Sequence, residues 1–222
     1  MCADAVRPAL TAAATLACLA FAAPAGAVQP QTVVLANSGT VEGPSCPANP
    51  CVVVSRTTAV QVKDGTVRNP FRVARDGRIV AWSVTLAVPS SGQIHYFDGH
   101  EGGTSRAALA VLRNSGGLDY TVVALSPVIH MQPYFGKTAQ LTLKHSLAVR
   151  RGDVVALTVP TWLPALAVGY PGTTSWRASR TPSECSNVTS QTAQRRIGAA
   201  AGYDCLYQTA LVTYSATERT HG

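Results

Sequence analysis

The sequence predicts an all-β protein, a two-sheet antiparallel β-sandwich of jelly-roll-like type, and three observations lead to this prediction. Apolar and polar residues alternate along short segments, most clearly in 78–89, where one face would carry Val80, Trp82, Val84, Leu86 and Val88. Such alternation is typical of a strand with one buried face. The chain is rich in Val, Thr, Ala and Gly and poor in Lys and Glu, which favours strands over helices. Turn residues recur at near-regular spacing between the segments, as they do in sandwiches.

The expected elements follow from these patterns along the chain. Strands are predicted at 31–36, 51–62, 66–74, 78–89, 106–113, 120–126, 139–143, 155–159, 165–170, 174–178 and 206–215. Arg151-Gly152-Asp153 is interpreted as the turn of a hairpin between 147–149 and 154–159. The polar stretch 181–204 is expected to form a long loop, and no segment after residue 27 is expected to be helical.

Three segments carry a resemblance to a known group of proteins: Arg78-Ile79-Val80-Ala81-Trp82, Gly152 to Pro160, and Ser175-Trp176-Arg177. In the order of its elements over 78–178, the chain resembles uncharacterised secreted β-sandwich proteins of actinobacterial type. The resemblance implies the fold of the chain. It implies no activity, so function must be inferred from the residues themselves.

The first 27 residues have the composition of a secretory signal. Arg7 precedes an apolar run over 9–23, and Ala25-Gly26-Ala27 supplies the small residues of a cleavage site. The run is too short to span a bilayer of about 30 Å as a permanent helix. We therefore expect a signal peptide at 1–27 and a secreted, extracellular single domain at 28–222.

The cysteines support the same compartment. Removal of 1–27 leaves four, for which three pairings are possible, and proximity in sequence favours Cys46–Cys51 and Cys185–Cys205. A zinc site is the competing interpretation, but the four are widely split and contain no C-x-x-C pair. Cys18 offers an alternative to cleavage after Ala27, as a lipidation site that would anchor the chain to the membrane.

A formal net charge of +7, almost all of it from arginine, limits the partners. A basic secreted protein can be drawn to anionic cell-wall polymer by long-range attraction. Nucleic acid is not expected, because the arginines are scattered and form no basic helix or aromatic-interleaved strand. No transmembrane segment is expected after residue 27, since no later stretch approaches about 20 apolar residues.

One cluster has metal-binding chemistry. His95, Asp98, His100 and Glu101 fall within seven residues of what we interpret as a glycine-rich loop. Imidazole with carboxylate suits zinc, and the carboxylates with backbone carbonyls suit calcium. The spacing matches no established metal motif, and there is no Gly-x-Ser-x-Gly elbow to indicate a serine hydrolase. A metal-dependent hydrolase that uses the His95–Glu101 loop is therefore kept as an alternative function.

Aromatic residues near turns lead to the main functional hypothesis. Trp162 lies between Pro160 and Pro164 and is expected to be exposed in a connection, while Tyr170 and Trp176 are further candidates for ligand binding. Exposed aromatic planes flanked by polar side chains suit the flat C–H faces of sugars. The sequence thus favours a non-catalytic module that binds extracellular or cell-wall polysaccharide. A structural component of an extracellular matrix or coat is the remaining alternative.

Overall fold

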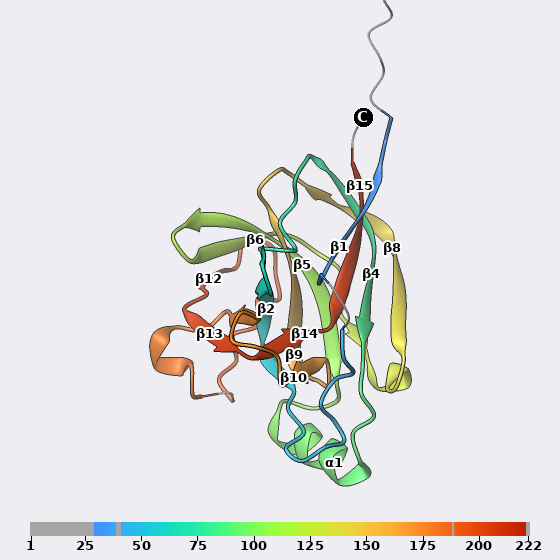
Figure 1. Ribbon diagram of the computed structural model, residues 1–222, viewed down its shortest axis with the longest axis vertical. Helices are drawn as coiled ribbons and strands as arrows, with labels where there is room; N and C mark the ends of the chain where they lie inside the picture. Colours follow the sequence, from blue (N-terminus) through green and yellow to red (C-terminus); the bar gives the residue numbers. More distant parts are fainter. Residues whose placement is uncertain (1–28, 39–40, 188, 221–222) are drawn as a thin grey trace, which may run out of the picture.

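The computed structural model describes residues 29–38, 41–187 and 189–220, so the predicted signal peptide at 1–27, with Cys18, lies outside the described residues. Two antiparallel sheets pack together, which confirms the all-β sandwich (Figure 1). The smaller sheet has the strand order β1 (Thr32–Ala36), β15 (Tyr214–Thr220), β4 (Gly77–Thr85), β8 (Thr138–Val149).

The larger sheet has the order β12 (Ala200–Gly202), β6 (Asp119–Leu125), β5 (Arg106–Gly116), β9 (Val154–Leu163), β2 (Val54–Asp64), β11 (Ser175–Ala178), β13 (Cys205–Gln208). Two short strands extend it, β3 (Val67–Arg68) beside β2 and β7 (Ile129–His130) beside β5. A separate ribbon pairs β10 (Leu166–Val168) with β14 (Ala210–Val212). The chain passes repeatedly between the two sheets, as jelly-roll and Greek-key sandwiches do.

Apolar side chains cover both faces of the larger sheet. Leu109 and Leu157 belong to the core between the sheets, together with Trp82 of the smaller sheet. A second buried cluster includes Leu112 and Tyr203. Because β9 contributes to both clusters, all ten of its residues are buried.

The segment predicted as a long loop, 181–204, reaches this second cluster. It contains a short 3-10 helix, η2 (Pro182–Glu184), as well as β12. Disulfides join Cys46 to Cys51 and Cys185 to Cys205, which confirms the predicted pairing. The second bridge ties the start of this segment to the first residue of β13.

The predicted burial pattern of β4 is wrong at both ends. Trp82, Val84 and Leu86 are buried as expected, but Ile79 is fully buried and Val80 is only half-buried. The pairing of β4 with β8 shifts between Ile79 and Ala81, and such a bulge changes which side chains face the core. Val88 lies beyond the end of the strand and is 57% exposed.

The expectation that the chain lacks helices is also wrong, because the interpreted loop contains the helix α1 (Ser91–His100). Ser90 caps it: its hydroxyl accepts from the Gln93 amide, and the Gln93 side chain accepts from the Ser90 amide. This reciprocal pair satisfies two donors at the helix start. A 3-10 turn, η1, follows at Gln132–Tyr134. Figure 1 shows α1 at one end of the sandwich.

Two connections differ from their predictions. The segment 206–215 is not one strand but parts of three, β13, β14 and β15, which lie in three different sheets. Thr209, between the first two, has φ +60°, a left-handed conformation that interrupts a strand. The turn at 151–153 joins β8 of the smaller sheet to β9 of the larger one, so it crosses between sheets and is not a hairpin turn.

A buried carboxyl in the smaller sheet gives the fold a pH dependence. Glu218 in β15 is 1% exposed, and its Oε1 has no hydrogen-bond partner among the described residues. Burial raises the pKa of this carboxyl above its ordinary value of 4.5. A raised pKa in the folded state contributes stability below the unfolded pKa, and that stability is lost as pH rises through the folded pKa.

We therefore expect Glu218→Gln to raise the denaturant midpoint at pH 7 and to leave it unchanged at pH 4, where the wild-type carboxyl is protonated. Urea unfolding at the two pH values measures the effect, with the exposed Glu42→Gln as the matched control. An equal gain from Glu218→Gln at pH 4 and pH 7 would contradict this assignment.

Candidate functional site

The four residues predicted to bind metal point to different surroundings. His95 and His100 are exposed on α1, and His100 Nδ1 hydrogen-bonds the Tyr96 carbonyl at 2.7 Å. Asp98 instead accepts from the indole Nε1 of Trp162 at 2.9 Å. Within the described residues no group of three or more His, Cys, Asp or Glu side chains is placed to hold a metal ion. The metal site and the hydrolase built on it stay predictions without geometric support.

Trp162 is fully buried, so its predicted exposure is wrong. It belongs to β9 and not to a connection, and its ring lies 5.0 Å from that of Phe97 and 5.6 Å from that of Phe135. A ring without exposed surface offers no plane on which a sugar can stack. Trp162 instead joins α1 to the core of the sandwich.

The other predicted tryptophan lines a surface groove. Trp176 in β11 and Tyr207 in β13 are register partners, and their rings stack 4.6 Å apart at 24°. The groove has a volume of about 260 Å³ where these strands meet the β10–β14 ribbon. Its remaining lining is apolar at Val52, Val53, Leu166, Val168 and Ala210, and polar at Ser55, Arg180, Gln208 and Thr209.

The polar side of the groove rests on a buried arginine. Arg180 is 2% exposed, donates from Nη2 to the Ser55 carbonyl at 2.7 Å and contacts the Tyr207 hydroxyl from Nη1. The Tyr207 hydroxyl donates in turn to the Cys185 carbonyl at 2.8 Å. These bonds fix the orientation of the guanidinium and of the tyrosine ring, so the groove is largely preformed.

Glu101, which was predicted as a metal ligand, contacts Ser55, one of the residues that line the groove. Burial raises the pKa of its carboxyl, while a hydrogen bond with Ser55 and the charges of Arg56 and Arg180 act in the opposite direction. Arg56 has φ +49° at the bulge where the pairing of β2 with β9 shifts. Bulges are found beside functional sites because they redirect a side chain. Glu101 therefore lies beside Ser55, which lines the groove, and among the described residues it is not placed as a metal ligand.

Tyr170 lies next to the groove but does not line it. Its backbone amide donates to the carbonyl of Thr209, a lining residue, and its hydroxyl accepts from the Glu42 amide. Of the three predicted ligand-binding aromatics, Trp176 lines the groove, Tyr170 adjoins it and Trp162 packs elsewhere. Tyr207 was missed, because its role depends on strand pairing and not on any local motif.

Fold and site together define an all-β sandwich with two intramolecular disulfides and an aromatic-lined groove. No protein-family model, curated protein or solved structure matches this chain. In the part of the chain that the structure describes, no helix is long and apolar enough to cross a membrane. Two disulfides are compatible with an extracellular protein.

Proposed function

We propose that this protein is secreted and binds extracellular or cell-wall carbohydrate, without catalysis, through the groove formed by Trp176 and Tyr207. The observation that carries the proposal is the stacked aromatic pair beside fixed polar groups. Small-molecule sites combine mainly apolar walls with a few placed polar groups, and this groove has both. Export rests on the sequence of residues 1–27, and the two disulfides support it.

The two rings have different tasks in this proposal. Trp176 is 5% exposed, whereas Tyr207 is half-buried, so Tyr207 supplies most of the contact surface. Trp176 stacks against the tyrosine and holds its plane. Gln208 is exposed at the groove and can hydrogen-bond sugar hydroxyls, whereas the buried Arg180 helps to hold Tyr207 in place. A volume of about 260 Å³ lies just below the range of drug-sized sites, about 300–1,000 Å³, and suits a single sugar unit.

Replacing Tyr207 by alanine tests the groove. We expect at least about tenfold weaker binding, or about 1.4 kcal/mol, because the contact plane is removed. Pull-down on insoluble cellulose, chitin and purified peptidoglycan, followed by titration on whichever retains the wild type, measures the change. Tyr207→Phe keeps the ring and should retain affinity within about threefold.

The matched control is Tyr96→Ala, which removes a tyrosine that is 55% exposed on α1, outside the groove. It should leave binding unchanged. Thermal unfolding of each variant separates a binding defect from a folding defect. Failure of the wild type to bind any of the three polymers, or equal losses from Tyr207→Ala and Tyr96→Ala, would overturn the proposal.

A further inference from the structure

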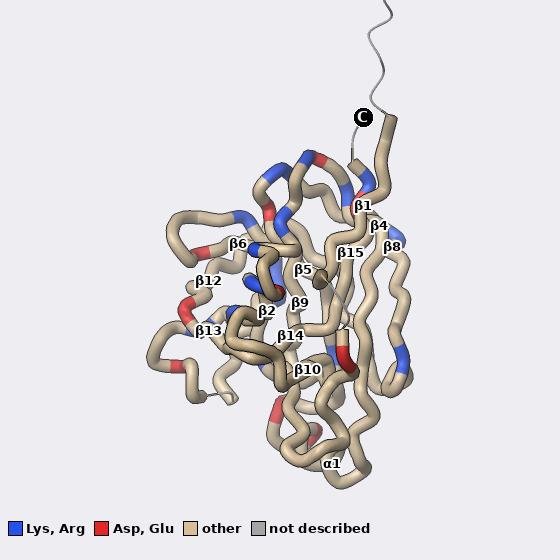
Figure 2. Tube along the Cα trace, viewed as in Figure 1, with Lys and Arg blue, Asp and Glu red and all other residues tan. Residues whose placement is uncertain are grey.

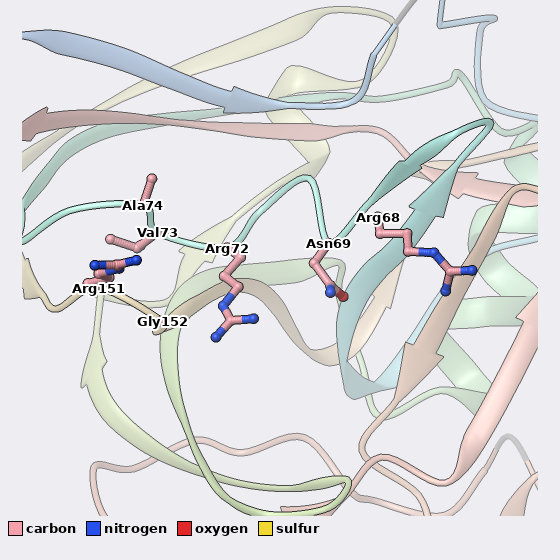
Figure 3. Close-up of a pocket in the computed structure, with 7 residues that line it drawn as sticks. All are labelled: Arg68, Asn69, Arg72, Val73, Ala74, Arg151 and Gly152. Atoms are coloured by element: carbon pink, nitrogen blue, oxygen red, sulfur yellow. The ribbon is translucent and has the colours of Figure 1, made fainter.

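A second hollow, which shares no lining residue with the groove, is rich in arginine. Its volume is about 440 Å³, and Arg68, Asn69, Arg72 and Arg151 line it. Figure 3 shows Arg151, Arg72 and Arg68 following one another along this hollow, with Asn69 between the last two. A hollow of about 230 Å³ adjoins it and shares Asn69, Arg72 and Gly152 with it. The two hollows form one elongated basic surface.

Arg72 is directed outwards by the buried residues on either side of it. Phe71 is fully buried and stacks on Tyr214 with ring centroids 4.0 Å apart, and Val73 is 1% exposed. Side chains alternate in extended backbone, so the residue between two buried ones faces solvent. The Phe71 carbonyl accepts from the Val155 amide, which ties this segment to β9. The arginine therefore projects from a fixed backbone.

Arg151 and Arg68 are also presented by short, hydrogen-bonded turns. Gly152 has φ +93°, and its amide donates to the Val73 carbonyl, which places Arg151 beside the segment of Arg72. Arg68 pairs with Lys63 in the antiparallel β2–β3 pair, and the turn between the two strands passes through Gly65 at φ +60°. Glycine adopts such angles without steric cost.

Three carboxylates near these arginines in sequence, Asp64, Asp76 and Asp153, have other hydrogen-bond partners. Asp64 accepts from the amide and the hydroxyl of Ser38. Asp153 is held by two hydrogen bonds of 2.9 Å from Arg113, the single ion pair among the described residues. Asp76 accepts from the backbone amide of Arg151, not from its guanidinium. In the described parts of the chain, the guanidinium groups of Arg68, Arg72 and Arg151 therefore face solvent without a carboxylate partner.

The distribution of Lys and Arg over the whole sandwich adds to the positive charge at this hollow. Figure 2 shows Lys and Arg gathered mainly in the half of the sandwich away from α1, while the segment 86–105 around α1 contains none. A one-sided basic surface attracts polyanions over long range. Within the described residues, basic side chains thus lie mainly in the half of the sandwich that contains this hollow.

We propose that the row Arg68–Arg72–Arg151 binds the oxyanion groups of a linear anionic polymer. Each guanidinium is a planar fork of donors that matches the oxygens of a phosphate or carboxylate. A row of such forks along an open, elongated hollow fits successive charges on one chain better than it fits a single ion. The site is independent of the carbohydrate groove, so each can fail without the other.

Polyphosphate is the first probe and polygalacturonate the second, with binding followed by fluorescence anisotropy of the labelled polymer. We expect Arg72→Gln/Arg151→Gln to weaken binding at least about tenfold and to reduce its salt dependence, because two direct contacts are lost. The matched control is Arg195→Gln/Arg196→Gln, an equal charge change at two exposed arginines outside the hollow. It should cost less than about threefold.

The outcomes separate the alternatives. Preference for polyphosphate identifies a phosphate-bearing polymer, and preference for polygalacturonate identifies a carboxylate-bearing one. Equal losses from the two double variants would show attraction by net charge alone and overturn the site. Tighter binding of single-stranded DNA of matched charge than of either polymer would overturn the assigned partner. Tyr207→Ala should leave polyanion binding unchanged, which distinguishes this site from the groove.

Discussion

Replacement of Trp162 by alanine should lower the free energy of unfolding by about 3–5 kcal/mol, the usual cost of deleting a buried tryptophan side chain. Trp162 is fully buried and packs against Phe97 of α1 and Phe135. Its indole also donates to Asp98, which accepts from Gln132 as well. The variant would leave a cavity beneath α1 and remove one of the two side-chain donors to the Asp98 carboxylate.

Urea unfolding at pH 7 measures this loss, and Tyr96→Ala is the control. Tyr96 is 55% exposed on the same helix, so its removal should change stability by no more than about 0.5 kcal/mol. Trp162→Ala should leave the affinity of the folded protein for carbohydrate unchanged, since Trp162 does not line the groove. A loss below about 1 kcal/mol would contradict the packed position of Trp162.

Trp162 also illustrates why local sequence misleads here. Pro160 and Pro164 indicated a connection, because proline lacks the amide that a central strand uses. The structure places Pro160 where its missing amide is tolerated: the paired ladder between β9 and β5 ends at Thr158. On the other side, the pairing with β2 shifts around Arg56. A bulge on a distant strand accommodates the proline, and no neighbouring residue signals it.

The strands themselves were predictable, because a sheet with one buried face needs an apolar residue at every second position. Which side chains at the start of β4 face the core was not predictable, because the register shift at Val80 arises from pairing with β8. The helix α1 carried a local signal that was overlooked. Ser90 and Gln93 have the spacing of a capping box, but the glycines around them favoured a loop.

The candidate sites were also predictable only in part from the sequence. Trp176 was identified from its sequence neighbours, but its partner Tyr207 depends on the register of β11 with β13. The arginine hollow joins residues from two turns about 80 positions apart, and charge patterning along the chain shows no such cluster. Composition therefore suggested the kind of partner that we propose, while only the fold brings these side chains together.

Removal of the Cys185–Cys205 disulfide should cost about 3 kcal/mol, and removal of Cys46–Cys51 about 2 kcal/mol. The difference follows from loop length, since Cys185 and Cys205 are 20 residues apart and Cys46 and Cys51 are 5 residues apart. A longer loop closed by a bridge excludes more conformations of the unfolded chain. Urea unfolding of Cys185→Ala/Cys205→Ala beside Cys46→Ala/Cys51→Ala measures both losses on one scale, and a reversed order would contradict the entropic account.

The longer bridge should also have a local effect that the shorter one lacks. Cys185 and Cys205 fasten the segment 181–204, and Tyr203 near its end is 1% exposed within the second apolar cluster. Freed at Cys185, this segment should open more often than the core, so amide exchange should accelerate across 181–204 and in β6, whose Val122 bonds to it. Exchange in β4 of the smaller sheet should rise only by the global loss of stability. Uniform acceleration in all three regions would mean that the bridge acts on the unfolded chain alone.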